Sequence, residues 1–246
     1  MTATLWRYTP VLLLAALWEG ITHSGIVPES ALPRLSDVVI ALHRLLGEDL
    51  LYQTGVSLMR GGTALLLAIV VGTAAGVFMA RYLPVRVVVK PFVQCFYPMP
   101  KSALIPLAIM WLGLGDISKI TLIFIGCLLP ITVSAFNATR GVDEVLLWSA
   151  RSLGAREGAV LREVILPAAL PEILSGIRVA LALSFIMMVS AELIIANNGI
   201  GFLIGTLGEV GEYEGMFAGV LTISLVGFLA DRGYGLLVRR ILIWRE

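Results

Sequence analysis

The chain has 246 residues, of which 58% are hydrophobic and 14% are charged, and its mean hydropathy is +0.93. Because soluble domains carry roughly 25% charged residues, this composition excludes an ordinary soluble domain and indicates that most of the surface faces lipid. The net charge of +1 provides no basic excess for binding nucleic acid. Cys95 and Cys127 both lie in apolar stretches, which favours buried core residues over a disulfide or a metal site.

Six apolar windows are long enough to be membrane spans, since a helix crosses a bilayer with about 20 mostly apolar residues. Residues 61–80 and 120–139 contain no charged residue, whereas the other windows carry one or more charges. We therefore predict an all-α integral membrane protein in which residues 1–246 form a single transmembrane domain. Its expected spans are residues 8–24, 54–80, 87–113, 117–139, 173–196 and 216–238.

The basic residues predict the orientation, because short cytoplasmic loops collect Lys and Arg. With the N-terminus inside, thirteen basic residues fall on the cytoplasmic side and four on the outer side. Both termini are therefore expected in the cytoplasm. The first span could instead be a cleaved signal peptide, but Glu19 interrupts it and no small-x-small cleavage site follows.

An external segment, residues 28–53, separates the first two spans. Its residues 36–46 have apolar side chains at helical spacing after Ser36, which is a favourable residue for capping a helix. We expect an amphipathic helix that lies on the outer membrane surface. His43 on this helix is expected to be a solvated surface residue, because no cluster of metal-binding residues accompanies it.

A cytoplasmic loop of about 32 residues, 141–172, lies between the fourth and fifth spans and is too long for a simple turn. The pattern predicts a short amphipathic helix up to Leu153 and a break at Gly154 in a left-handed conformation. A second helix should follow and end at Pro167. Without further information this could be a simple interfacial hairpin.

This loop resembles the "EAA" loop of ATP-binding-cassette (ABC) importer permeases, whose pattern is Glu-Ala-Ala, three residues, Gly, nine residues and Ile-x-Leu-Pro. Counting from Gly154 places the first element on residues 148–150 and the last on residues 164–167. Trp148 departs from the pattern, because it replaces the acidic residue. Other stretches are similar to the nitrate, sulfonate and taurine branch of these permeases: residues 97–107, 111–119, 170–178, 191–194 and 199–202.

The resemblance implies a type I importer permease bundle in a bacterial inner membrane. Two copies of such a chain work with two ATPase subunits, which bind ATP and Mg, and with an external solute-binding protein. The transported solute would be a small anion such as nitrate, a sulfonate, taurine or bicarbonate. The resemblance also implies that the loop docks on the ATPase through Trp148, Ser149, Ala150, Leu153, Gly154, Ala155, Leu166 and Pro167.

The residues agree with a transport subunit that has no ATPase site of its own. The sequence contains no G-x-x-x-x-G-K-[ST] phosphate loop. Its two histidines, His23 and His43, are not in a pattern that predicts a catalytic group, a cofactor or a metal site. The docking loop also occurs only once, and the sequence has no internal repeat, which favours a homodimer.

A candidate translocation path follows from residues that are unfavourable in lipid. Lys101 and Glu192 lie within predicted spans, where ionisable groups face a cavity or pair with each other. Pro98 and Pro100 interrupt the third span and free backbone polar groups for a water-filled path. The sequence leaves open whether Lys101 and Glu192 line or gate the path or form a structural ion pair.

Two other classes of function remain as alternatives. An ion-coupled secondary transporter could use Glu19, Lys101 and Glu192 as a relay, but such a carrier has no need of a docking loop. A membrane-embedded enzyme or assembly factor is disfavoured by the missing catalytic groups.

Overall fold

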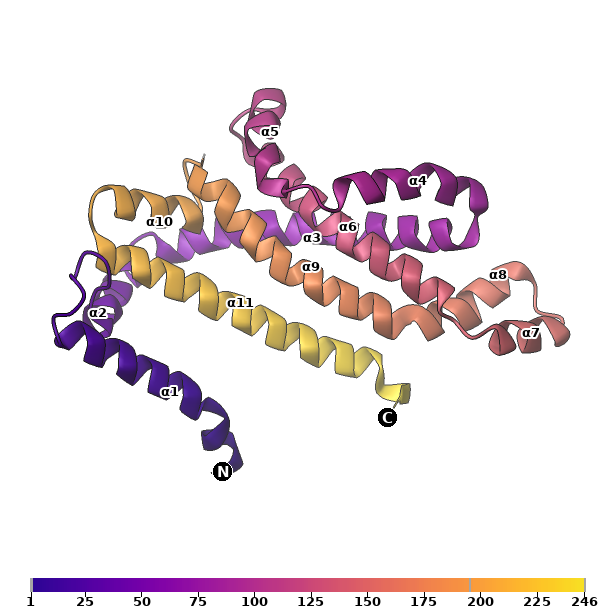
Figure 1. The fold of residues 1–246 in the computed structure, drawn as a ribbon, viewed down its shortest axis with the longest axis horizontal. Helices are drawn as coiled ribbons and strands as arrows, with labels where there is room; N and C mark the ends of the chain where they lie inside the picture. Colours follow the sequence, from indigo (N-terminus) through magenta and orange to yellow (C-terminus); the bar gives the residue numbers. More distant parts are fainter. Residues whose placement is uncertain (1, 195, 246) are drawn as a thin grey trace. The chain divides into compact units, whose positions relative to one another are not determined.

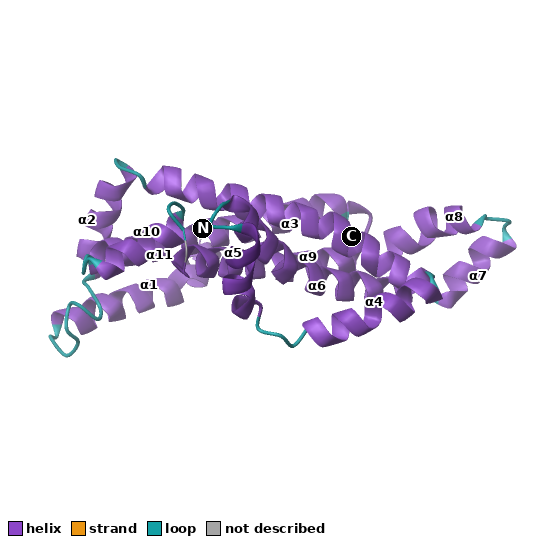
Figure 2. Cartoon of the chain, turned by 90° about the horizontal axis from the view of Figure 1, so that it is seen from above, coloured by secondary structure: helices purple, strands orange, loops and turns teal. Residues whose placement is uncertain are grey.

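A computed structural model describes residues 2–194 and 196–245, so that residue 195 of the expected 173–196 span lies outside the described part. These residues form helices joined by short loops (Figures 1 and 2). The helices longer than ten residues are α1 (Thr2–His23), α2 (Leu35–Leu46), α3 (Leu50–Arg81), α4 (Leu83–Phe96), α6 (Asp116–Arg140), α9 (Leu166–Ile194) and α11 (Tyr213–Ile241). The shorter helices are α5 (Ile105–Leu112), α7 (Glu144–Ser152), α8 (Glu157–Ala159) and α10 (Ile200–Glu209).

Four helical segments of the described chain are long and apolar enough to cross a membrane: Leu50–Arg81, Asp116–Arg140, Glu157–Ile194 and Tyr213–Ile241. They contain the second, fourth and sixth predicted spans and residues 173–194 of the fifth. The prediction of an all-α membrane protein is thereby confirmed. The expected first span forms α1, a 22-residue helix that is not among these four.

The expected third span, residues 87–113, is interrupted at Pro98 and Pro100, as the sequence predicts. Helix α4 ends at Phe96, and the chain bends at Tyr97–Pro100 before a 3₁₀ turn at Lys101–Leu104 leads into α5. The physical reason is that Pro98 and Pro100 lack the N–H groups that would continue the ladder, and that proline disfavours helical backbone in the preceding residue. Neither α4 nor α5 is long enough to cross a bilayer alone.

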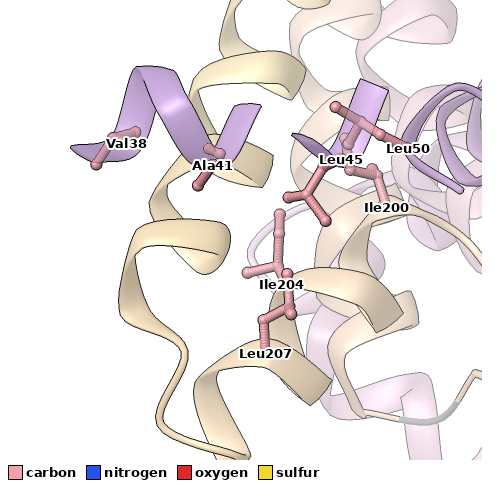
Figure 3. Packing of buried hydrophobic residues seen from close by; sticks show 8 residues of the cluster. Val38, Ala41, Leu45, Leu50, Ile200, Ile204 and Leu207 are labelled. Carbon is pink, nitrogen blue, oxygen red and sulfur yellow. The ribbon is translucent and has the colours of Figure 1, made fainter. Parts of the chain in front are cut away.

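The structure divides into two compact units, which are described separately. Unit 1 comprises residues 1–57 and 192–226, and unit 2 comprises residues 58–191 and 227–246. In unit 1, one face of α2 packs into an apolar cluster with α10 and α11 (Figure 3). Its buried members are Val38, Ala41, Leu45, Leu50, Ile200, Ile204, Leu207 and Ala218. The face of α2 that carries Val38, Ala41 and Leu45 is thus covered by protein, and the position of this helix at the outer membrane surface stays a prediction.

The start of α2 is capped by another helix. Arg34 occupies the N-cap position and its side chain makes no capping hydrogen bond. Instead, the Glu19 carboxylate of α1 accepts hydrogen bonds from the backbone N–H groups of Leu35, at 2.8 Å, and Ser36, at 3.4 Å. The prediction that Ser36 caps this helix is therefore wrong. A carboxylate fills this place well because the free N–H groups and the helix dipole favour negative charge there.

In unit 2, glycines bring three long helices into close contact. A Cβ atom added to Gly76 of α3 would lie 2.5 Å from the backbone oxygen of Thr132 on α6. A Cβ atom added to Gly176 of α9 would lie 2.2 Å from the Cβ atom of Ser134 on α6. Such contacts leave no space for any side chain, which is how small residues allow helices to associate in lipid.

Candidate functional site: a helical hairpin and a buried carboxylate

The first candidate site is the α7–α8 hairpin, defined here as residues 143–165. Asp143 caps α7, since its carboxylate accepts a hydrogen bond of 2.9 Å from the N–H of Val145. Helix α7 packs against the segment Val160–Ile165, whose Val160 and Ile165 are buried. The predicted helix-break-helix pattern is present, with α7 as its first arm.

The break between the two arms depends on Gly154. Its φ angle is +84°, as predicted from the sequence, and this left-handed conformation is unfavourable for residues with a side chain. The N–H of Gly154 donates to the carbonyl of Arg151 at 2.9 Å, and the N–H of Ala155 donates to the carbonyl of Ala150 at 3.1 Å. These two bonds form a Schellman motif, which satisfies the free carbonyls at the end of α7.

The second arm does not end at Pro167, which corrects the prediction. A π-helical stretch at Val160–Ile165 joins α8 to α9, so that the helical segment is continuous from Glu157 to Ile194. Proline normally interrupts a helix because its ring clashes with the carbonyl four residues earlier. The wider π-helical stretch directly before Pro167 changes the hydrogen-bond spacing there and accommodates the ring.

The expected docking residues are mostly exposed on α7 and the turn. Trp148 is 62% exposed and Leu153 is 89% exposed, and Ser149 and Gly154 are exposed as well. The half-buried members of the expected set are Ala150, Ala155 and Leu166, and Pro167 is exposed at the start of α9. With Val145 and Leu146, which are also exposed, the hairpin presents apolar side chains that nothing in the described chain covers.

An acidic residue that sequence reasoning missed holds the hairpin to α3. Glu157, the first residue of α8, pairs with Arg151 of α7, whose Nε lies 3.0 Å from its carboxylate. The same carboxylate pairs with Arg81, the last residue of α3. No local signal marks these pairs, although the run of arginines in residues 140–162 could have directed attention to the few acidic residues among them.

The second candidate site is Glu192, near the end of α9. It is 1% exposed and accepts hydrogen bonds from the hydroxyl of Ser57, at 2.6 Å, and from the N–H of Gly201, at 3.0 Å. The N–H of Ile200 in turn donates to the Ser57 oxygen at 2.8 Å. The carboxyl group thereby lies at the N-terminus of α10, where its oxygen satisfies a free backbone N–H.

Gly199, which precedes α10, completes this arrangement. Its φ angle of +110° and ψ angle of 161° fall in a region that glycine alone adopts readily. Its N–H donates to the side-chain oxygen of Gln53 at 2.6 Å. A Cβ atom here would lie 2.4 Å from the Glu192 carboxyl group. We call Gln53, Ser57, Glu192 and residues 199–201 the Glu192 network. The sequence analysis singled out Glu192 and, as a family-like stretch, residues 199–202, but it missed Gln53 and Ser57.

Lys101 lies at the bend in the expected third span. Its ammonium group donates to the carbonyl of Tyr97 at 2.6 Å and lies 5.5 Å from the centre of the Tyr97 ring. This carbonyl lies just past the end of α4, and the lysine side chain satisfies it. Pro98 and Pro100 are exposed at the bend. Lys101 belongs to unit 2 and Glu192 to unit 1, and their described partners differ.

No group of three or more His, Cys, Asp or Glu residues within the described ranges could hold a metal ion. Cys127 is buried, as expected, but the expectation of a buried core residue is wrong for Cys95, which is exposed; both are free.

Comparisons with known proteins identify the family. Residues 68–243 match the family described as "Binding-protein-dependent transport system inner membrane component". The chain belongs to this family. A taurine transport system permease protein of Escherichia coli is 33% identical over 94% of this chain and 86% of its own length. A putative aliphatic sulfonates transport permease protein of Bacillus subtilis is 33% identical over 95% and 85%.

Further matches agree with this family. A bicarbonate transport system permease protein of Synechococcus elongatus is 29% identical over 80% of this chain and 71% of its own length. Among solved structures, a chain of the MetNI methionine ABC transporter has a TM-score of 0.68 at 20% identity, covering 79% of this chain and 97% of that chain. These matches confirm the ABC importer permease fold and favour an importer permease over an ion-coupled carrier. The family is the membrane component of its transporters and is distinct from the ATPase.

Proposed function

We propose that this permease chain forms the translocation path for a small anionic solute and is coupled to partner ATPases through residues 141–172. The observation that supports this most is the α7–α8 hairpin, which exposes an apolar surface at the position of the family's docking loop. Relatives named for taurine, aliphatic sulfonates and bicarbonate suggest a solute of this class. An external binding protein would deliver it.

The exposed side of α7 is suited to a groove in a partner protein. Trp148 and Leu153 are large and exposed, and aromatic side chains at an exposed helix surface are typical anchors of an interface. Since Trp148 replaces the acidic residue of the family pattern, the matching groove should offer an apolar pocket there. Exposed apolar groups at a water-facing loop are unfavourable unless a partner covers them.

Movement of the docked hairpin would reach the bundle by two routes. The first is covalent, because α8 continues into α9. The second route is through Glu157, which forms one ion pair with Arg151 of α7 and another with Arg81 at the end of α3. These two ion pairs connect α7 with α3. Exposed ion pairs stabilise little, so their value here would be in keeping the hairpin and α3 together during a conformational change.

Pro98, Pro100 and Lys101 are our proposed path residues, because a lysine next to an interrupted helix offers positive charge to an anion. Glu192 would act as a gate residue by holding α10. The chain would work as a homodimer with two ATPase subunits, which supply ATP and Mg binding, and with both termini in the cytoplasm. One hairpin per chain fits one groove per ATPase.

Reconstitution in liposomes tests the proposal. The chain is co-expressed with the ATPase of its own transport system, and the mass of the complex is measured by native mass spectrometry. We expect two copies of each chain, and uptake of labelled taurine or another sulfonate that requires ATP and the binding protein. Uptake driven by an ion gradient without ATP would contradict the coupling, and one copy of this chain per complex would contradict the homodimer.

A further inference from the structure

A pocket of about 450 Å³ lies between α9 and α11 within unit 2. Three arginines and one carboxylate line it: Arg178, Arg232, Arg239 and Asp231. Its other walls include the apolar side chains of Leu174, Leu236 and Val238. The pocket therefore combines a surplus of positive charge with apolar walls.

The single carboxylate of the pocket, that of Asp231, is paired with Arg178. Asp231 accepts two hydrogen bonds from the Arg178 guanidinium, at 2.6 and 2.7 Å. The hydroxyl of Tyr234 donates to the carbonyl of Leu174 at 2.6 Å, so two polar contacts join α9 and α11 beside the pocket. The charge of Asp231 is balanced by Arg178, and the surplus charge belongs to Arg232 and Arg239.

These two arginines lie on one face of α11. They are seven residues apart, which is two helical turns or about 10.5 Å along the helix. The guanidinium of Arg232 lies over the ring of Phe228 at 5.1 Å. Because this contact uses the flat face of the guanidinium, the N–H groups at its edge can still donate to an anion.

The surface around the pocket indicates what the anion is attached to. Next to it, α11 exposes Leu229, Leu236 and Leu237, and on a helix of a membrane protein such side chains contact acyl chains. An arginine beside lipid-facing leucines is unfavourable unless an anion or water meets it. A ligand with a negative head and an apolar tail satisfies both parts of this surface.

We propose that the pocket binds the anionic head group of a phospholipid, with its phosphate oxygens accepting hydrogen bonds from Arg232 and Arg239. Its acyl chains lie along Leu236 and Leu237. Basic pockets between membrane helices are known to suit such head groups. The proposal does not depend on the transported solute or on the role of the α7–α8 hairpin.

Native mass spectrometry of the complete transporter tests this site. The complex is placed in bilayers of phosphatidylcholine with graded amounts of phosphatidylglycerol, and retained lipids are counted. We expect retained phosphatidylglycerol on the wild-type complex. In Arg232→Gln/Arg239→Gln its apparent affinity should fall about 30-fold, since each basic contact contributes roughly a fivefold factor. Arg240→Gln, a neighbouring arginine outside the pocket lining, is the matched control and should bind as the wild type does.

Three results would overturn the proposal. Equal binding by the double variant and by Arg240→Gln would show that the pocket is not the site. Retention of phosphatidylcholine as well as phosphatidylglycerol would show that the head-group charge is not recognised. Displacement by millimolar inorganic phosphate would identify a site for free anions. All variants keep the Arg178–Asp231 pair, so we expect them to fold. Elution of each variant as an intact complex with the ATPase checks this.

Discussion

The Glu192 network and the α7–α8 hairpin differ in how far their unusual side chains are buried. The network is buried, and the Glu192 carboxylate receives hydrogen bonds from a hydroxyl and a backbone N–H. The hairpin is held by ion pairs at the surface and leaves Trp148 and Leu153 uncovered. Both contain a glycine with positive φ, Gly199 and Gly154. The difference supports our proposal that a partner covers the hairpin, whereas the described hydrogen bonds of the network lie within one chain.

Glu192→Ala should cause the largest loss of stability. It removes the acceptor of the Ser57 hydroxyl and of the Gly201 N–H, which stay buried, and the cost should be about 3 kcal/mol of unfolding free energy. Unfolding of the detergent-solubilised chain measures it. Glu209→Ala, at the exposed end of α10, is the control and should change stability by less than about 0.5 kcal/mol. Equal stability of the two variants would show that the network does not stabilise unit 1.

The two glycines allow a matched comparison. Gly199→Ala introduces both an unfavourable backbone conformation and a Cβ atom 2.4 Å from the Glu192 carboxyl carbon, so we expect a loss of about 2 kcal/mol or more. Gly154→Ala has a similar backbone penalty but nothing within 4 Å of the added atom, so about 1 kcal/mol is expected.

The Gly154→Ala variant also separates an effect on stability from an effect on transport. Gly154→Ala should reduce transport per ATP hydrolysed more than its small stability loss explains, because the Schellman turn positions α7. Gly158→Ala, which also meets nothing within 4 Å and has no positive φ, is its control. If Gly154→Ala transported as much solute per ATP hydrolysed as Gly158→Ala does, the Gly154 turn would have no part in docking.

The spans in α3 and α6 were predictable because hydropathy depends only on the local sequence. The Gly154 turn was predictable because a glycine between two amphipathic runs commonly ends the first helix in a left-handed conformation. Features that depend on distant residues were not. Glu192 and Ser57 are 135 residues apart, and the cap of α2 comes from Glu19, sixteen residues before Leu35. The predicted helix end at Pro167 was wrong because the sequence does not show that a π-helical stretch precedes this residue.

Glu157→Gln should change stability little, by about 0.5 to 1 kcal/mol, since the Glu157 carboxylate is exposed in both ion pairs and only Arg81 is half-buried. Coupling should suffer more, and we expect ATP hydrolysis to continue while transport falls several-fold. The exchanged pair Arg81→Glu/Glu157→Arg should recover part of the transport by restoring opposite charges. Glu163→Gln, exposed on the same arm, serves as control. Transport at the wild-type level in Glu157→Gln would rule out this link between hairpin and α3.

Trp148→Ala should leave the stability of the chain almost unchanged, because the side chain is mostly exposed. Its effect should be on assembly, since an aromatic anchor often contributes about 2 kcal/mol to binding, or roughly 30-fold in affinity for the ATPase. Titration of the ATPase against the chain in lipid nanodiscs measures this affinity, with Ser152→Ala, exposed at the end of α7 and outside the expected docking set, as control. An unchanged affinity would mean that Trp148 lies outside the docked surface.

The glycine contacts in unit 2 limit how this part of the permease can move. At Gly76 the nearest atom to an added Cβ is a backbone oxygen of α6, and at Gly176 it is a side chain of α6. Sliding or rotating either helix past α6 would bring neighbouring residues with larger side chains into these gaps. The segments of α3, α6 and α9 around Gly76 and Gly176 should therefore shift together as one rigid group, and we expect any conformational change during transport to bend the chain elsewhere, such as at Tyr97–Pro100.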